Sequence, residues 1–255
     1  MTHNDELRIE ALTSPEIAEA IAAGFRTAIL PLAAIEQHGP HLPLSVDSDH
    51  ADALAIRIAR RLGDALVLPT VRVGHSPHHL GFPGTLSLRA STLEAVCLDY
   101  CAHLAAHGFH RVLLFSGHIG NYPIMRQFAP RLVAAVGPRL HVLVYGESAA
   151  VLDAWRAAAD SVSGVGAHVG GHADVVETSV MLALHPEKVR ADRAVAGYRG
   201  TVDEEFLDRA FLEGIDAVSH NGVLGTPAGM SETIGHAALE GVTELVVDYA
   251  KANGA

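Results

Sequence analysis

The sequence predicts an α/β protein, built as a three-layer α/β/α sandwich with a mostly parallel sheet. Short apolar runs, typical of buried strands, alternate along the chain with longer stretches typical of helices. Such alternation favours a parallel sheet that helices cover on both faces. Hydrophobic residues make up 49% of the 255 positions and charged residues only 18%, so one large core can form. Neither a repeat nor a linker interrupts the chain, and we therefore expect a single domain over residues 1–255.

Local signals predict the elements in chain order. Thr13-Ser14-Pro15-Glu16 marks the start of a first helix, with Ser14 as its cap and Pro15 at the first helical position. Apolar runs predict the strands, which are Ala28–Leu32, Ala65–Leu68, Thr70–Val73, Arg111–Phe115 and Leu140–Tyr145. Longer patterns predict the helices, which are Ala51–Leu62, Thr92–His107, Pro123–Val136, Ala173–Leu184 and Glu232–Ala252. The segment Gly74–Leu86 is expected to be irregular, and Ser161–Gly171 is expected to be an active-site loop.

Charge and cysteine content narrow the class of protein. A formal net charge of −11 disfavours nucleic acid or an anionic membrane as a partner. The N-terminus is polar and acidic, unlike a signal peptide, and no apolar stretch is long enough to span a membrane. Cys97 and Cys101 lie on one helical face, which predicts two buried thiols in a reducing compartment. We therefore expect a cytoplasmic protein.

The densest chemistry lies where the first apolar run ends. That run leads directly into Glu36, His38, His41, Asp47 and Asp49. Carboxylates and imidazoles are costly beside a buried element unless something compensates them. A divalent metal ion does so, because it takes both carboxylate oxygen and neutral imidazole nitrogen as ligands. The alternative for this segment alone is a solvated polar loop.

Two further clusters favour the metal site. The run that ends at Phe115 closes with His118 in a glycine-rich turn, and the segment Gly170–Met181 carries His172 and Glu177 at the start of a helical pattern. Open α/β sheets bind ligands just beyond the carboxyl ends of their strands. We therefore expect the three clusters to converge there and to form a metal site.

The same segments resemble the creatininase (creatinine amidohydrolase) family. Glu36-Gln37-His38-Gly39-Pro40-His41, followed by Asp47, is similar to the opening signature of that family. The resemblance continues in the same order through Gly81–Thr85, Ser116–His118 with Asn121, His172–Ala173 with Glu177–Ser179, and Gly222–Gly225. It implies a creatininase-like α/β fold, C–N bond hydrolysis and two divalent metal ions per subunit. Zn²⁺ is the first expectation, with Mn²⁺ or Fe²⁺ as alternatives. It also implies a homo-oligomer, as members are often homohexamers.

The resemblance assigns roles to individual residues. It makes Glu36, His38, Asp47, His118 and Glu177 the metal ligands, with Asp47 as the bridge between the two ions. His172 matches a histidine close to the substrate and is the candidate proton donor to the leaving nitrogen, so His172 and Glu177 are the expected catalytic residues. Two bridged cations about 3.5–4 Å apart can share one hydroxide and polarise one carbonyl.

A histidine-rich loop and the turn after His118 supply the expected substrate contacts. These are His78, His79, Ile119, Gly120 and Asn121. His75 belongs to the same loop, which approaches the active site of the same or a neighbouring subunit in the family. His41, Asp49 and His50 are expected around the ligands or at a helix cap, outside the metal shell.

Two departures from the family pattern put creatinine itself in doubt as the substrate. Creatinine-hydrolysing members carry a glutamate two positions after the histidine that matches His118, and this chain has Gly120 there. They also line their pocket with tryptophans, whereas Trp155 is the single tryptophan here and is equally explained as a core or interface residue. The His-x-Gly-Asn version is shared with the mycofactocin-maturation peptidase and with a deformylase of formylaminopyrimidine nucleotides.

Three functions remain open at this point. The first is metal-dependent hydrolysis of a small, typically cyclic amide such as creatinine, a related lactam or a formamide. The second is trimming of a short precursor peptide on the same scaffold, or deformylation of a formylaminopyrimidine nucleotide. The third is a non-catalytic metal-binding protein, for which the absence of a glutamate at Gly120 is the argument.

Overall fold

The structure is a computed structural model that describes residues 6–200 and 204–254. Its central sheet has four parallel strands in the order β2-β1-β3-β4. These strands are β1 (Thr27–Leu32), β2 (Ala65–Val67), β3 (Arg111–Ser116) and β4 (His141–Val144). All six residues of β1 are buried, as a strand covered on both faces requires. Within the described ranges, no helix is both long enough and apolar enough to cross a bilayer.

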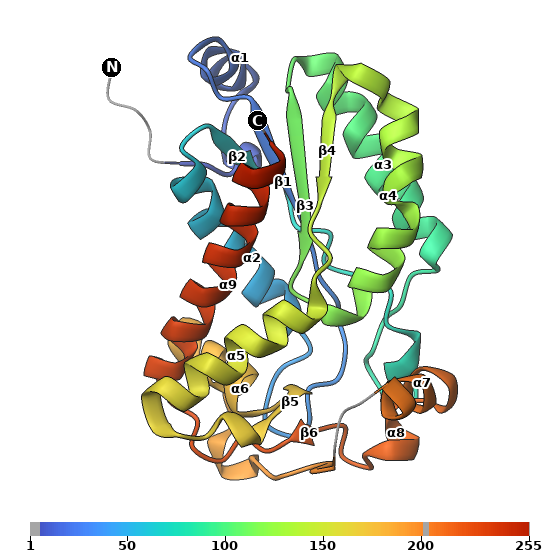
Figure 1. The fold of residues 1–255 in the computed structure, drawn as a ribbon, viewed down its shortest axis with the longest axis vertical. Coiled ribbons are helices and arrows are strands. Elements are labelled where there is room, and N and C mark those ends of the chain that lie inside the picture. The colour runs from blue at the N-terminus through green and yellow to red at the C-terminus, as the bar shows by residue number, and fades with distance from the viewer. Residues whose placement is uncertain (1–5, 201–203, 255) are drawn as a thin grey trace.

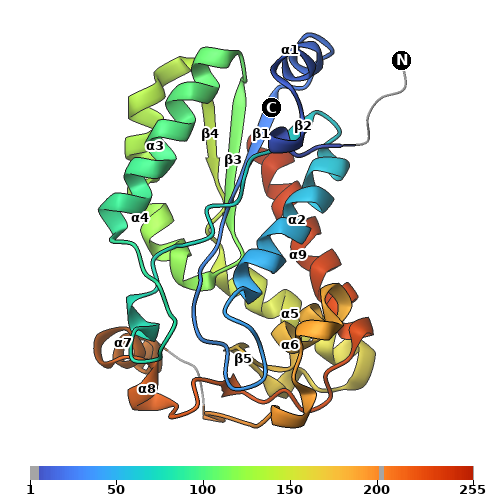
Figure 2. The same ribbon diagram turned by 180° about the vertical axis from the view of Figure 1, so that it is seen from behind.

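Helices cover both faces of this sheet, as the alternating pattern predicts. In Figures 1 and 2, α3 (Ala90–His107) and α4 (Tyr122–Val136) lie on one side of the sheet, while α2 (Val46–Leu62) and α9 (Glu232–Asn253) lie on the other. The layers are therefore those of an α/β/α sandwich. The remaining α-helices are α1 (Ser14–Ala22), α5 (Ser148–Ser163), α6 (Val175–Leu184), α7 (Glu204–Glu213) and α8 (Ile215–Val218).

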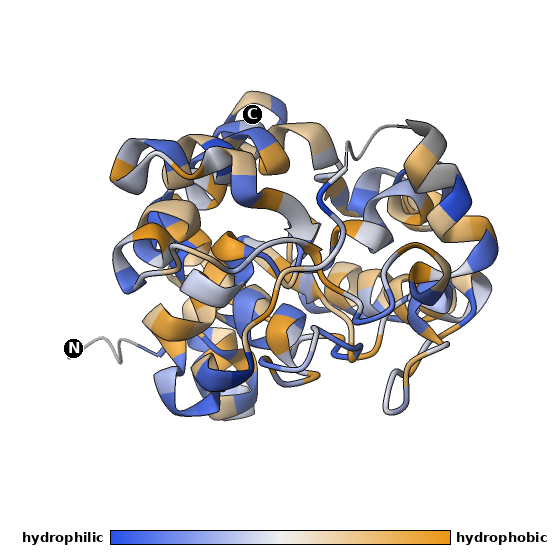
Figure 3. Cartoon of the chain, turned by 90° about the horizontal axis from the view of Figure 1, so that it is seen from below, coloured by the Kyte–Doolittle hydropathy of each residue, from blue (hydrophilic) through white to orange (hydrophobic). Residues whose placement is uncertain are grey.

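The chain also forms a small antiparallel pair of strands, which lies at the lower end of the molecule in Figure 1. This pair consists of β5 (Val169–His172) and β6 (Leu224–Gly225). Short 3-10 helices lie at Ile9–Ala11, Pro77–His79, Ile119–Asn121, Gly137–Arg139, Gly166–His168, Pro186–Lys188 and Ala191–Arg193. Figure 3 looks onto this lower end, where the loops that follow the parallel strands lie.

Several predicted boundaries need correction. The segment Thr70–Val73 is not a strand, because Val71 forms only an isolated bridge to Leu32 after the chain leaves β2. The predicted loop Ser161–Gly171 is instead the end of α5, a 3-10 turn and the start of β5. The cap of α1 is Thr13 and not Ser14, since Thr13 shares a capping box with Glu16.

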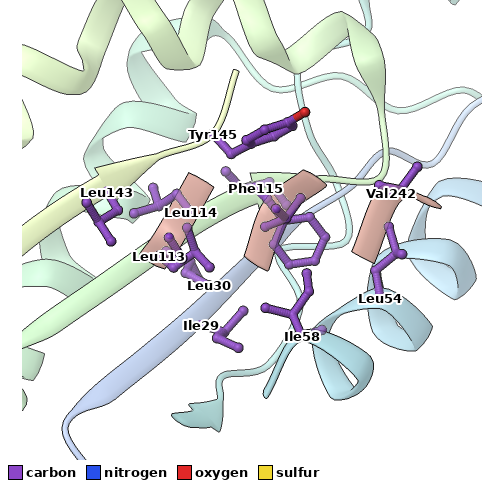
Figure 4. Close-up of a cluster of buried hydrophobic side chains, with 14 of the residues drawn as sticks. Ile29, Leu30, Leu54, Ile58, Leu113, Leu114, Phe115, Leu143, Tyr145 and Val242 are labelled. Atoms are coloured by element: carbon purple, nitrogen blue, oxygen red, sulfur yellow. The ribbon is translucent and has the colours of Figure 1, made fainter. Parts of the chain in front are cut away.

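The core fills the space between the sheet and the helices. Figure 4 shows side chains of β1 and β3, among them Ile29 and Phe115, beside Ile58 of α2. Val242 of α9 belongs to the same core. Trp155 is 1% exposed and is therefore a core residue, which decides between the two roles that the sequence allowed.

Both cysteines and the apolar stripe of α9 are also internal. Cys97 and Cys101 are buried free thiols, and burial raises the pKa of the Cys97 thiol to about 12. Leu239, Val242 and Val246 of α9 are buried against the core. The apolar stripe of this helix is therefore explained by packing within the chain.

A close approach between β3 and α2 positions the polar clusters. Gly117 follows β3 directly, and a Cβ atom there would lie 2.3 Å from the backbone oxygen of Asp47. Only glycine allows the backbone to come so near. The first turn of α2 therefore lies against the end of β3, which brings Asp47 close to His118.

Candidate metal centre

The five predicted metal ligands come together beyond the carboxyl ends of β1 and β3. Two of them follow β1, Asp47 lies in the first turn of α2, His118 follows β3, and Glu177 lies in the first turn of α6. All five side chains are buried; they are Glu36, His38, Asp47, His118 and Glu177. The convergence of strand ends that the sequence predicts is therefore present in the fold.

The ligand atoms form two groups that meet at Asp47. Its Oδ2 atom lies 3.5 Å from Nδ1 of His118, which is in turn 3.3 Å from Oε1 of Glu36. Its Oδ1 atom lies 3.3 Å from Nε2 of His38, which is 3.6 Å from Oε2 of Glu177. Each oxygen of one carboxylate thus belongs to a different set of donors, as a bridging carboxylate requires.

The donor atoms fit a divalent cation in spacing and in chemistry. Two ligands that each bind one cation at ~2.1 Å with tetrahedral angles lie roughly 3.4 Å apart, and the four separations above are 3.3–3.6 Å. Among the described residues, Glu36 Oε1, His38 Nε2 and Asp47 Oδ2 are buried without a hydrogen-bond partner. Such atoms are expensive to bury, and one cation in each donor group would satisfy all three. The cluster can therefore hold a metal ion.

The backbone fixes the orientation of His38. Its Nδ1–H donates to the carbonyl oxygen of Glu36 at 3.1 Å, which leaves Nε2 as the unprotonated nitrogen. That atom faces the carboxylates of Asp47 and Glu177. Burial opposes charge on this imidazole, but the two carboxylates outweigh burial and raise the pKa of His38 well above its usual value. Without a cation, a proton takes its place between these groups.

Burial also opposes negative charge on the three carboxylates of the cluster. Burial, with the nearby Asp47, raises the pKa of Glu36 well above its usual range. Burial raises the pKa of Asp47 to about 6, although His38 opposes this shift. For Glu177, burial acts in the opposite direction to His38, and the attraction of His38 keeps its pKa low. The cluster is thus short of positive charge, which is what a metal would supply.

Gln37, between two of the ligands, sets the tautomers of two further histidines. The carboxamide oxygen of Gln37 accepts from the backbone N–H of Gly39 at 2.9 Å, and its nitrogen donates to the carbonyl of Gly222 at 3.1 Å. The same nitrogen lies 2.8 Å from Nδ1 of His79. With the amide orientation fixed by two backbone groups, its second hydrogen goes to His79. His79 therefore carries its proton on Nε2, which lies 3.4 Å from Oε1 of Glu36.

His172 also carries its proton on Nε2. Its Nε2 lies 2.7 Å from the backbone oxygen of Gln37, which only accepts, so Nε2 carries the proton. The Gln37 carboxamide nitrogen, 2.9 Å away, has no further hydrogen for this atom. Nδ1 of His172 is left unprotonated, 3.6 Å from Oε1 of Glu36 and 3.9 Å from Oε2 of Glu177. The imidazole thus presents an unprotonated nitrogen to the cluster.

A turn clamped by Asp174 holds His172 and Glu177. Its buried carboxylate caps α6 through the backbone N–H groups of Val176 and Glu177, at 2.8 and 3.1 Å. The other oxygen accepts from Gly170 and Gly171 at 2.9 and 2.8 Å. Between the two halves, Ala173 adopts φ 51°, and its N–H donates to the Glu177 carboxylate. Asp174 is not among the residues predicted from the sequence, although aspartate before a helical pattern is an N-cap signal.

Most of the predicted substrate contacts border a cavity beside the cluster. Its lining includes His78, His79, Ile119 and Gly120, together with the ligands Asp47, His118 and Glu177. Asn121 is the exception and needs correction. Its carboxamide nitrogen donates to the Ala33 carbonyl at 2.9 Å, and its oxygen accepts from the backbone N–H of His75 at 2.9 Å. Fully buried, it braces the backbone behind the cavity.

The three remaining predicted residues lie outside the ligand groups. His41 pairs with the Thr178 hydroxyl at 2.9 Å. Asp49 accepts from Lys188 at 2.7 Å, and His50 lies against the Trp155 ring, with the ring centroids 5.9 Å apart. The ion pair of Asp49 separates it clearly from Asp47, its neighbour in the first turn of α2.

Gly120 is required by the packing of the His118 ring. A Cβ atom at this position would lie 2.3 Å from Nε2 of His118 and 2.9 Å from Cε1 of His78. Any side chain here would displace one of these two imidazoles. The arrangement of donors in this chain is therefore built without a fourth carboxylate at position 120.

The geometry agrees with the comparison to known proteins. A family model described as "Creatininase: Creatinine amidohydrolase" matches residues 10–250. The chain belongs to the creatininase family.

Individual relatives in the family carry different names. The chain is 34% identical over 205 residues to a mycofactocin precursor peptide peptidase of Mycolicibacterium smegmatis. The aligned region covers 78% of this chain and 74% of the relative. The chain is also 34% identical over 200 residues to the creatinine amidohydrolase of Pseudomonas putida, with 72% and 74% covered. The solved structure named "Creatininase Mn" superimposes with a TM-score of 0.76 at 27% identity, covering 98% of this chain and 100% of that one. The creatininase-like fold and the hydrolase class of this chain follow from these matches and its family membership.

Proposed function

We propose that this chain uses two divalent metal ions to hydrolyse the C–N bond of a small amide. The observation that carries the proposal is the position of the Asp47 carboxylate between two groups of donors. Its two oxygens lie 3.3 and 3.5 Å from different histidines. Glu36 and His118 would hold one ion, and His38 and Glu177 the other. Zn²⁺ is the first expectation, and the manganese form of a creatininase with a similar fold supports Mn²⁺ as an alternative.

The residues around the ions supply the proton transfers. When bound, the cations supply Lewis acidity, polarising the amide carbonyl and lowering the pKa of a coordinated water. His172 faces the cluster with its unprotonated Nδ1, while the Gln37 carbonyl holds its Nε2–H at 2.7 Å. In this tautomer it can accept a proton from the attacking water and then deliver that proton to the leaving nitrogen. The family resemblance implies that His172 donates a proton. We add an earlier step, in which His172 acts as the base that takes this proton from the water.

Cleavage of a peptide is the second candidate function. It is supported by the 34% identity to a protein named as a precursor peptide peptidase, which is as high as the identity to the creatinine amidohydrolase. The glycine at position 120, with no room for a glutamate beside His118, is a departure from the creatinine-hydrolysing pattern. Both reactions break an amide C–N bond, so the same groups serve either one.

An activity screen with the metal-loaded enzyme tests the proposal. Creatinine, hydantoins, lactams, formamides and short peptides would each be incubated with protein loaded with Zn²⁺, Mn²⁺ or Fe²⁺, and metal content would be measured on the same samples. We expect hydrolysis of at least one amide class, abolished by chelation and restored by metal. Protein that binds no metal, or that binds metal and cleaves no amide, would contradict the proposal.

A further inference from the structure

The cavity beside the metal centre has two chemically different walls. One wall consists of the ligand groups Asp47, His118 and Glu177 with His172. The other is apolar and comes from α5, α7, α8 and the turn after β3; its members include Ile119, Leu152, Phe206, Ala210, Phe211 and Ile215. Among the described residues that line the cavity, every charged side chain belongs to the predicted metal ligands.

Part of the apolar wall belongs to a small hydrophobic cluster of its own, while Ile119 and Leu152 pack against the main core. Phe206, Ala210 and Ile215 form a hydrophobic cluster with Leu224 of β6, distinct from the main core. Figure 1 shows α7 and α8 at the lower end of the molecule, away from the central sheet. The ring of Phe211 lies 4.4 Å from that of His78, which is parallel to the ring of His118 to within 13°. The apolar wall therefore extends to the ligands themselves.

Phe211 is apolar and yet incompletely covered. It is 45% exposed although its ring contacts His78 at the cavity. The cavity volume is about 170 Å³. An apolar cavity of about 150 Å³ is sufficient to bind benzene. Among the described residues, the apolar wall itself offers no charged side chain that could pair with a charged group placed against it.

We propose that the substrate carries, beside its scissile amide, an uncharged apolar group about the size of a benzene ring, and that Phe211 and Ala210 bind this group. The inference rests on the proposed function, since it names the substrate class of the same site. An aromatic or branched aliphatic side chain of a peptide, or an aryl or alkyl group of a small amide, has this chemistry. Creatinine lacks such a group.

The first test measures binding without any scissile bond. ¹⁹F NMR would follow 4-fluorobenzyl alcohol and, as the small control probe, 2-fluoroethanol, titrated into the metal-loaded protein. We expect the aromatic probe to bind and the small probe not to bind measurably. Phe211→Ala should weaken aromatic binding by roughly tenfold, the usual range for a changed apolar contact, and Ala210→Trp should block it by filling the cavity.

Leu212→Ala is the matched control. This residue is next to Phe211 on α7 but is 85% exposed and does not line the cavity, so its variant should bind the aromatic probe like the wild type. Because Ala210→Trp can disturb α7, Phe211→Ala is the deciding variant. Equal binding of the two probes, or unchanged aromatic binding in Phe211→Ala, would overturn the inference.

A kinetic comparison separates this inference from the proposed function. If the enzyme is an amidohydrolase, phenylacetamide should have a KM at least roughly tenfold below that of acetamide, and Phe211→Ala should reduce this difference. Hydrolysis of both amides with equal KM contradicts the apolar site and leaves the amidohydrolase activity standing. Binding of the aromatic probe without hydrolysis of any amide contradicts the proposed function and leaves the apolar site standing.

Discussion

The Nε2–H of His172 donates to the backbone oxygen of Gln37 over 2.7 Å. Because a backbone carbonyl only accepts, this contact assigns the tautomer and turns the unprotonated Nδ1 toward Glu36 and Glu177. Burial and the neighbouring His38 lower the pKa of His172 to about 3, so the imidazole is neutral at physiological pH. In this orientation the lone pair of Nδ1 faces the cluster, where it is placed for proton transfer.

His172→Ala should keep its metal and lose roughly 10²- to 10⁴-fold in turnover, the usual contribution of general acid–base catalysis. Nδ1 of His172 lies 3.9 Å from Oε2 of Glu177, outside the 3.3–3.6 Å range of the ligand separations, and 3.6 Å from Oε1 of Glu36, at the upper end of that range. Metal content per chain and kcat would be measured on one preparation. Loss of metal would identify His172 as a ligand, and unchanged kcat would assign proton transfer to another group.

Asp47→Ala should remove more metal than substitution of any other ligand, because its two oxygens face both donor groups. Asp49→Ala is the matched control in the same helical turn; it loses an ion pair with Lys188 and no metal. Elemental analysis after dialysis against a weak chelator would measure both. Equal metal loss in the two variants would show that the bridging residue had been assigned to the wrong aspartate.

The fold and the polar clusters around the site could be predicted because both are local in sequence. Strand-like runs followed by polar residues mark the segments that contain Glu36, Asp47 and His118, and the family resemblance then selects these residues from neighbours such as Asp49. What surrounds them could not be predicted in the same way. Gln37 acts through contacts with Gly222 and His172, which lie far along the chain. The apolar wall depends on how α7 packs against β6, and no periodicity in the sequence encodes that contact.

Metal affinity should rise with pH through about 6. Burial raises the pKa of Asp47 to about 6 and that of Glu36 well above its usual range, so the metal-free folded protein holds protons on groups that must be ionised to bind metal. For a carboxylate with a raised pKa, the metal-free fold loses stability as pH rises through the folded value, and a cation removes that cost. The difference in Tm between metal-loaded and chelated protein should therefore grow from pH 5 to pH 8. A constant difference would contradict this reasoning.

We expect a homo-oligomer in solution. The family resemblance makes a hexamer the first expectation. The apolar stripe of α9 does not provide the contact, because Leu239, Val242 and Val246 are in the core. The irregular segment Gly74–Leu86 is the candidate contact, since it exposes Leu80 and Leu86 at 56% and 54%. Light scattering at micromolar concentration should give a mass several times 26.8 kDa, and Leu80→Glu with Leu86→Glu should lower it. A monomeric wild-type protein would refute the expectation.

Asp174 should prove to be a positioning residue for Glu177 and His172. One oxygen of its carboxylate caps α6, and the other holds the N–H groups of Gly170 and Gly171. Asp174→Ser keeps a capping hydroxyl but cannot reach the glycines, so it separates the two tasks. We expect this variant to fold, to lose roughly 1–3 kcal/mol of stability from unsatisfied backbone donors, and to bind metal more weakly than the wild type. The exposed Asp153→Asn on α5 is the control, with its side chain 73% exposed. If Asp174→Ser lost stability but kept wild-type metal affinity and kcat, Asp174 would serve the helix alone and the clamp would have no part in holding the site.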